Sequence, residues 1–288
     1  MQVHQLESTN AFIVFDYEDA PTSVGVVRAA SKVLVDGAVL RARSVTYALA
    51  TFGLHQAGAS AGINAKAKAR DEAVAAFVTE IGPLVAERRF LPWPGNGISA
   101  EDLAPLREHD PRPATVFADE TRLLAAGAVA AADVVANGLT GKRAAVVAAE
   151  TLADAVRDEV VRRGGETVDG GLDAECDVLF VAGPPETVDH HIAEGVRAGV
   201  LVPLSPVPVT TRALAVLSRA GTVVVPDFVS AAAPLLVGDG RGDPVERVAA
   251  SAAELKDAGT GTWLAAAERA EAFLSTWQNS LPFGRPLS

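Results

Sequence analysis

The second half of the chain alternates short apolar runs with amphipathic stretches in a regular order. The apolar runs are rich in Val, Leu and Ala and are typical of strands covered on both faces. Strand–helix alternation with short turns predicts a parallel, doubly wound sheet. The predicted strands are 143–149, 166–169, 176–183, 199–205 and 222–228, and the predicted helices between them are 151–163, 186–197 and 210–221.

The first half of the chain shows one strong helical pattern among weaker ones. Apolar residues at 68–89 fall on one helical stripe and predict an amphipathic helix. Residues 10–16 predict a strand, and residues 24–28 predict its antiparallel partner. Three glycines at 53–65 indicate tight turns or a close approach of two backbones. The remaining expectations are helical spacing at 36–52, a loop at 91–97 in which Trp93 packs, mostly helix at 99–138, and helix at 244–277 with a break at 259–261.

Composition and charge limit the classes of function. Apolar residues make up 49% of the 288, so a sizeable core is available, and aromatic residues only 5%, so Ala, Val and Leu must fill it. The net charge of -11 argues against a general nucleic-acid binder and against binding to an anionic membrane. The single cysteine, Cys176, fits a reducing compartment. Without a basic-then-apolar leader or a run of about 18 apolar residues, a cytoplasmic protein is expected.

Several segments resemble the glutamate/leucine/phenylalanine/valine dehydrogenases, the amino-acid dehydrogenase family. AGTVVVPDFVSAAAP resembles the family's G-I-L-V-V-P-D-F-L-A-N-A-G-G, LTGKRAAVV resembles L-K-G-K-x-V-A-V, and GLHQAGASAGI resembles G-L-P-L-G-G-A-K-G-G-I. Their order and rough spacing agree from about residue 24 to 235. The resemblance implies an α/β protein of two domains. These are an N-terminal α/β domain for substrate and oligomerisation at 1–115, a connecting helix at 116–138, a Rossmann-like doubly wound parallel sheet at 139–240, and C-terminal helices at 241–288 that return towards the N-terminal domain.

The family's reaction is the NAD(P)-dependent oxidative deamination of amino acids. It uses a lysine of lowered pKa, an aspartate that relays protons, and a second lysine that holds the substrate carboxylate. By the resemblance, these fall on Ser60, Gly95 and Ala48. Asn96, beside Gly95, cannot act as a base, because an amide does not titrate. Only Arg28, in a segment that resembles the family's G-G-x-R, could still bind a carboxylate.

The expected cofactor site has also lost its characteristic residues. A dinucleotide fold needs glycines after its first strand, so that the backbone can approach the pyrophosphate. Here the turn holds Ala149, Glu150 and Thr151, and the Glu150 carboxylate would repel a phosphate. Asp169 stands where an acid could bind the adenosine ribose. The asparagine of the family's A-N-G-P-T-T falls on Val207. We therefore expect no cofactor, with NAD or NADP as the alternative.

Other candidate chemistry is sparse. His55 stands near Ser60 in the sequence and could form half of a nucleophile–base pair, but no acid is close enough to complete a triad. His190 and His191 are adjacent at a predicted helix start and should not share a face, so no metal site is expected. A cleft lined by Ser60, Asn96 and small residues could bind a small neutral or apolar molecule.

Three functions remain open. The combined losses favour a non-catalytic, ligand-binding or regulatory subunit that assembles with itself or with an active dehydrogenase paralogue. The alternative is an NAD(P)-dependent oxidoreductase that acts on an amino acid or related molecule (CH–NH2 donors) with altered catalytic residues. A purely structural scaffold is the third. Nucleic acid and membrane are not expected as partners.

Overall fold

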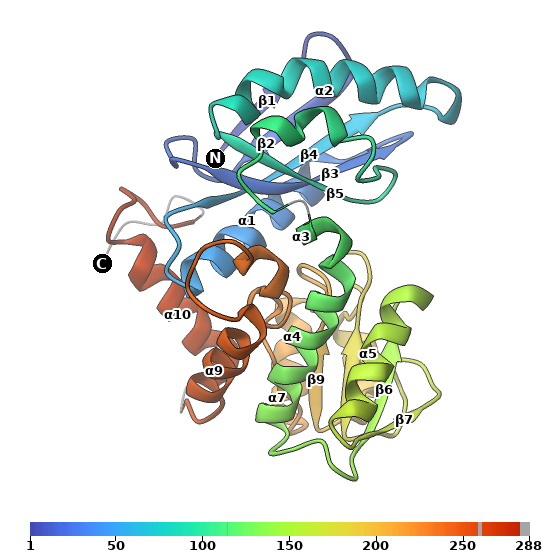
Figure 1. Cartoon of the computed structure of the whole chain (residues 1–288). Helices are drawn as coiled ribbons and strands as arrows, with labels where there is room; N and C mark the ends of the chain where they lie inside the picture. The colour runs from blue at the N-terminus through green and yellow to red at the C-terminus, as the bar shows by residue number, and fades with distance from the viewer. Residues whose placement is uncertain (114, 259–260, 283–288) are drawn as a thin grey trace. The chain divides into compact units, whose positions relative to one another are not determined.

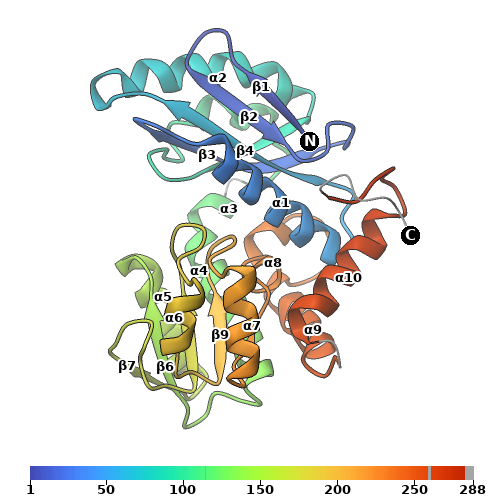
Figure 2. The same cartoon turned by 180° about the vertical axis from the view of Figure 1, so that it is seen from behind.

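The structure, a computed structural model, describes residues 1–113, 115–258 and 261–282 and divides into two units (Figures 1 and 2). Unit 1 comprises Met1–Phe117 and Ala270–Ser288, and unit 2 comprises Ala118–Arg269. Two residues of the predicted break at 259–261 lie outside the described residues, as does the end of the chain. No helix in the described ranges is both long and apolar enough to cross a membrane.

Unit 1 is built on a mixed sheet of five strands in the order β1-β2-β4-β3-β5. β2 pairs antiparallel with both β1 and β4, whereas β3 pairs parallel with both β4 and β5. The strands are β1 (Gln2–Gln5), β2 (Ala11–Phe15), β3 (Ser23–Ala30), β4 (Ala57–Asn64) and β5 (Phe90–Pro94).

The predicted pairing of residues 24–28 with residues 10–16 is wrong. β3 does run opposite to β2, but β4 lies between them and forms hydrogen bonds with both. The connection at 16–22 is much longer than the two-residue turn of a tight hairpin, so the chain can pass over one strand position.

The glycine-rich stretch at 53–65 forms β4 for most of its length rather than tight turns. The expected close approach of backbones is confirmed, because a Cβ on Gly58 would lie 1.8 Å from the carbonyl oxygen of Ala42 in α1 (Val35–Thr51). A Cβ on Gly25 would lie 1.9 Å from the carbonyl oxygen of Ala59. Gly58 is therefore needed for α1 to pack on β4, and Gly25 is needed for β3 to lie beside β4.

The predicted loop at 91–97 begins as a strand instead. β5 contains two prolines, which an edge strand tolerates because one side of it needs no donors. Trp93 is 3% exposed, so its predicted packing is confirmed.

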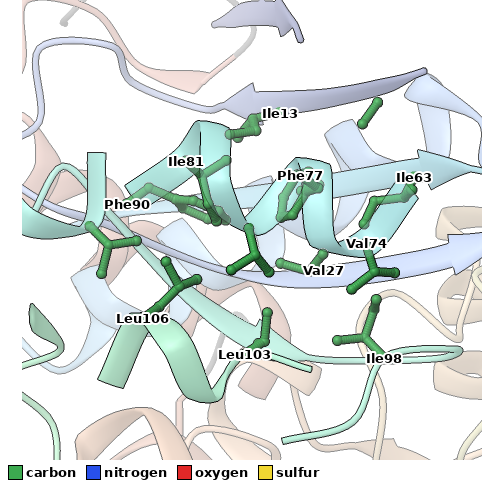
Figure 3. Packing of buried hydrophobic residues seen from close by; sticks show 14 of the residues in the cluster. Ile13, Val27, Ile63, Val74, Phe77, Ile81, Phe90, Ile98, Leu103 and Leu106 are labelled. Carbon is green, nitrogen blue, oxygen red and sulfur yellow. The ribbon is translucent and has the colours of Figure 1, made fainter. Parts of the chain in front are cut away.

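The face of this sheet opposite α1 carries the main apolar cluster of unit 1. α2 (Arg70–Ala86) supplies the predicted stripe, in which Phe77 and Ile81 pack against Ile13, Val27 and Ile63 of the sheet (Figure 3). Two short helical segments contact α2 beside it, η1 (Ala67–Ala69) and η2 (Ala104–His109). Phe117 of α3 (Thr115–Ala118) packs instead on Trp93 of β5.

Unit 2 is built on five parallel strands in the order β10-β9-β8-β6-β7, which confirms the predicted Rossmann-like doubly wound sheet. α6 and α7 pack on one face, and α4 and α5 contact strands from the other (Figures 1 and 2). The strands are β6 (Arg143–Val147), β7 (Glu166–Val168), β8 (Val178–Val181), β9 (Val200–Pro203) and β10 (Val223–Val224). The helices are α4 (Glu120–Val135), α5 (Glu150–Arg162), α6 (His190–Gly195), α7 (Thr211–Arg219), α8 (Asp227–Ser230), η3 (Ala233–Leu236) and α9 (Pro244–Lys256). The last helix, α10 (Thr262–Leu274), begins in unit 2 and ends in unit 1.

Two predicted elements of unit 2 are shorter than the pattern indicated. The helix expected at 186–197 begins only at His190, because the Asp189 side chain caps it by accepting hydrogen bonds from the backbone of His191 and Ile192. The strand expected at 222–228 ends at Val224, and Asp227 already begins α8.

Candidate functional site

The side chains of β3, β4 and β5 that face α1 form the candidate site of unit 1. Alternate residues of a strand point to opposite faces. Val27, Ala29 and Ala61 belong to the cluster on the α2 face. Arg28, Val26 and Ser60 therefore lie on the α1 face.

Ser60 is completely buried under α1. Its hydroxyl donates a hydrogen bond to the carbonyl oxygen of Val26 at 3.4 Å. Ala48, in the last turns of α1, is 3% exposed and offers only a methyl group. Neither position holds a group that ionises at neutral pH.

Gly95, directly after β5, has no room for a side chain. A Cβ there would lie 2.2 Å from Cγ1 of Val26 and 2.9 Å from the carbonyl oxygen of Val27. The Val26 side chain therefore occupies the space above Gly95. Val26 stands where the G-G-x-R pattern that this segment resembles has its second glycine. The change from glycine to valine was the one sequence feature that could have revealed that the space above Gly95 is filled.

The candidates Asn96 and His55 lie at the surface. Asn96 is exposed, and its backbone oxygen accepts a hydrogen bond from the backbone of Ala29 at 2.9 Å. The His55 ring lies 4.8 Å from the ring of Phe273 and 5.5 Å from that of Trp277. The structure thus places His55 among aromatic residues of the C-terminal segment, while the Ser60 hydroxyl binds the backbone of β3.

Arg28 is half-buried beside a second arginine that sequence reasoning did not select. Burial, and then the charge of Arg41 in α1, lower the pKa of Arg28 to about 10. Burial lowers the pKa of Arg41 as well. An arginine in the middle of an apolar helical pattern was the available indication of Arg41.

Arg43, two residues further along α1, is paired by the chain itself. Its Nε donates to Oδ1 of Asp16 at 2.6 Å, and Nη2 lies 2.6 Å from the same oxygen. Arg43 is 8% exposed and Asp16 only 2%. This buried ion pair links α1 to the residue after β2.

The turn after β6 in unit 2 occupies the predicted cofactor position. α5 begins at Glu150, and Ala149 precedes it without a side-chain cap. A helix N-terminus favours a negative charge, and the exposed Glu150 carboxylate supplies one there. Thr151 and Asp169, which directly follows β7, are also exposed.

Val207 has an unusual backbone conformation. Its φ of 54° lies in the left-handed region, which asparagine tolerates and a β-branched residue rarely adopts. The backbone N–H of Val207 donates to Oδ2 of the buried Asp227 at 2.9 Å. The loop therefore keeps a conformation suited to asparagine while the side chain is apolar.

Potential metal ligands do not gather in the described residues. The rings of His190 and His191 lie 3.9 Å apart, closer than the helix-face argument suggested. Within the described ranges, however, no group of three or more His, Cys, Asp or Glu side chains is placed to hold a metal ion. Burial raises the pKa of the Cys176 thiol, which disfavours a reactive thiolate.

One groove of unit 2 is apolar. It measures about 410 Å³ and is lined by residues of α7, β10 and the start of α10, such as Leu214, Val224 and Trp263. None of the described residues that line it ionises. It lies outside every predicted site.

Comparison with known proteins identifies the fold. Neither a protein-family model nor a curated protein matches the sequence. Among solved structures, a hetero-hexameric glutamate dehydrogenase from Thermus thermophilus, in its Leu-bound form, matches with a TM-score of 0.74 and 18% identity over 92% of this chain and 83% of its own. An L-tryptophan dehydrogenase from Nostoc punctiforme matches with a TM-score of 0.70 and 17% identity over 97% of each chain. Glutamate dehydrogenase 2 from Plasmodium falciparum matches with a TM-score of 0.70 and 11% identity over 93% of this chain and 81% of its own. The chain has the fold of the amino-acid dehydrogenases.

Proposed function

We propose that this chain, which has the fold of the amino-acid dehydrogenases, is a non-catalytic subunit that has lost oxidative deamination and acts through ligand binding or assembly. The observation that carries the proposal is the filled space at Gly95. No aspartate can stand there unless Val26 and the backbone of β3 move, because a Cβ alone would lie 2.2 Å from the Val26 side chain. Without a base at this position, the proton transfers of the reaction have no carrier.

The neighbouring positions support the same interpretation. Ser60 is fully buried and bonded to backbone, so it offers neither the positive charge nor the reach of a catalytic lysine. Ala48 offers no charge for a substrate carboxylate. Three losses of chemical groups in one site exceed what a change of substrate would require.

Features of unit 2 support the loss of cofactor binding. Glu150 places a carboxylate at the helix N-terminus, where the pyrophosphate of a dinucleotide would lie. The carboxylate and the pyrophosphate are both negative, so they would repel each other. Val207 retains an asparagine-like backbone without the amide that could bind a ligand. We therefore propose that neither NAD nor NADP is a resident cofactor, and that no metal takes its place.

Assembly is the second part of the proposal. The Thermus thermophilus neighbour is described as hetero-hexameric, so this fold can assemble from unlike chains. We propose that this chain associates with itself or with an active dehydrogenase paralogue, in the cytoplasm. Light scattering of the purified protein tests self-association. A measured mass equal to that of a single chain would contradict self-association.

The decisive experiment measures turnover and cofactor binding separately. Purified protein is assayed with a panel of L-amino acids plus NAD⁺ or NADP⁺, and with 2-oxo acids, ammonium and NADH or NADPH, beside an active dehydrogenase. We expect no amino-acid-dependent change in NAD(P)H and no cofactor binding up to millimolar concentration in calorimetry. Turnover that rises with protein concentration and elutes with the protein would overturn the proposal.

Asp169 favours a second candidate function. It is exposed directly after β7, where an acid could bind a ribose, and it would serve an NAD(P)-dependent oxidoreductase with altered catalytic residues. Micromolar NADH binding, worth about 8 kcal/mol, that is lost in Asp169→Ala would favour this alternative over the non-catalytic subunit.

A further inference from the structure

Arg28 and Arg41 combine burial and charge in a way that the loss of catalysis does not explain. Nε and Nη2 of Arg28, and Nε of Arg41, are sealed from solvent and donate to no acceptor within the described part of the chain. The charge of Arg41 further disfavours that of Arg28. Two desolvated cations with no carboxylate between them destabilise a fold, unless something outside the chain neutralises them.

Other partly buried arginines of unit 1 have partners. Arg107 has no salt bridge in the described residues, but its guanidinium group stacks on the ring of Phe117 at 3.4 Å, and the other three are paired with carboxylates. Arg70 is paired with Asp102, Arg112 with Asp110, and Arg43 with Asp16. The chain carries a net charge of -11, so carboxylates are abundant. Among the residues that the structure describes, no carboxylate pairs with Arg28 or Arg41.

Part of each guanidinium group stays accessible. Nη1 of Arg28 and both Nη atoms of Arg41 are neither sealed from solvent nor bonded to any protein group in the described ranges. An anion arriving from solvent can therefore reach nitrogens of each side chain. Guanidinium groups match the oxygen spacing of carboxylate and phosphate and bind them with two parallel hydrogen bonds.

Two neighbours of Arg28 matter for such a ligand: the backbone at Gly95, against which its side chain lies, and Trp93, whose fluorescence can be measured. Val26 and Trp93 are opposite one another in the β3–β5 register, and Arg28 follows Val26 by two residues on the same face. At Gly95 a Cβ would lie 3.2 Å from Cγ of Arg28, so this side chain lies against bare backbone. Trp93 is thus close enough for its fluorescence to report a change at Arg28.

We propose that Arg28 and Arg41 together bind a small oxyanion with two negative charges, whose carboxylate or phosphate oxygens accept hydrogen bonds from both guanidinium groups. Two negative charges are required because two cations must be neutralised. This inference deepens the proposed function, on which it rests, by naming the class of ligand that a non-catalytic subunit would bind.

The test uses the full chain without cofactor or amino acid. Inorganic phosphate, succinate and, as a singly charged control, acetate are titrated by calorimetry and by tryptophan fluorescence at constant ionic strength set with sodium chloride. We expect phosphate or succinate to bind below about 1 mM and to raise the melting temperature. Acetate should bind much more weakly. The two arms show whether phosphate or dicarboxylate chemistry is preferred.

Variants identify the site. Arg28→Met and Arg41→Met should each weaken binding by about tenfold or more, as expected for the loss of a charge-assisted hydrogen bond. In chloride buffer, each variant should melt at a higher temperature than the natural chain, because an unpaired cation is gone. Arg89→Gln, an exposed arginine of the same unit with no side-chain partner within the described ranges, is the matched control and should change neither property.

Two outcomes would overturn the inference: no saturable binding of phosphate or succinate below about 10 mM, or binding that both methionine variants retain. If Arg28→Met does not fold, Arg41→Met gives the same answer. Failure here would leave the proposed loss of catalysis intact, and turnover in the dehydrogenase assay would leave anion binding intact, so the two failures are distinguishable.

Discussion

Arg41 and Arg43 stand two residues apart on α1, and only one of them is paired within the protein. At 3.6 residues per turn, two positions along a helix point roughly 200° apart. Arg43 reaches Asp16 beside β2, whereas Arg41 lies beside Arg28 of β3. The comparison separates two uses of a buried charge. The ion pair of Arg43 and Asp16, here called the closed pair, joins α1 to the end of β2. The two like charges of Arg28 and Arg41 have no carboxylate between them in the described part of the chain, so an anion from solvent can bind there.

The largest expected effect comes from breaking the closed pair. Asp16→Asn removes the negative charge from Arg43 and should lower the free energy of unfolding by about 3–5 kcal/mol, the penalty for leaving one buried charge uncompensated. Urea denaturation measures it.

A double variant sharpens this prediction. Asp16→Leu combined with Arg43→Met removes both charges and should recover most of the loss, because an apolar pair needs no compensation. A loss below about 1 kcal/mol in Asp16→Asn would show that this pair contributes no more than a surface ion pair.

The next effect concerns the contact that places α1 and both of its arginines on the sheet. Gly58→Ala should lower the free energy of unfolding by about 3 kcal/mol, because its Cβ would lie 1.8 Å from the carbonyl oxygen of Ala42. Gly37→Ala, in α1 itself, meets nothing within 4 Å. This control should instead raise stability by about 0.5–1 kcal/mol. Equal effects in the two variants would contradict the close approach seen here.

The smallest effect uses Tyr17 as a reporter of the closed pair. Burial and the charge of Asp16 raise the Tyr17 pKa from 10.0 to about 12, and the hydroxyl donates to the backbone oxygen of Ser280 at 2.9 Å. The folded state therefore holds this proton more tightly than the unfolded state does. Stability should be unaffected by Tyr17 below pH 10 and should fall by about 2 kcal/mol as the pH rises from 10 to 12.

Alkaline denaturation of Tyr17→Phe and of Asp16→Asn checks that assignment. The phenylalanine variant should lose this part of the pH dependence. The asparagine variant should titrate at lower pH, because the carboxylate that disfavours the phenolate is gone. An unchanged pH profile in both variants would place the dependence on other groups.

Unit 2 followed from its sequence because its central strands, β8 and β9, are buried on both faces. The run VLFV of β8 and the run VLVP of β9 are apolar at every position, and their order along the chain fixes a parallel sheet once the connections are helical. Most differences lay at the ends of elements, where a cap such as Asp189 decided the boundary, and the short segments α8 and η3 were not predicted.

Unit 1 was harder because its central strand is made of small residues. AGASAGIN has no strand pattern, yet it forms β4, since Gly58 and its neighbours are selected by the space under α1 and not by local preference. The place of β4 between β2 and β3 is likewise set by contacts between segments distant in sequence.

The candidate site, too, could be predicted from the sequence only in part. The absence of ionising groups at Ser60, Gly95 and Ala48 could be anticipated by the resemblance. That Val26 fills the space at Gly95, and that Arg41 stands beside Arg28, depends on which side chains meet across a strand and a helix. The sequence offers only indirect signs of them, Val26 in place of a glycine and an arginine within an apolar helical pattern, and neither says which side chains meet.

The division of unit 1 along the chain has a consequence for biosynthesis. Ala270 and Leu274 pack with Tyr17, Ala50 and Ala57, so the core of unit 1 includes residues that leave the ribosome only after the whole of unit 2. Unit 2 is continuous and can fold while the remainder is still being made. The N-terminal part of unit 1 therefore cannot complete this core until the segment that begins at Ala270 has been made. During this interval apolar surface of unit 1 is uncovered, which favours aggregation of the nascent chain.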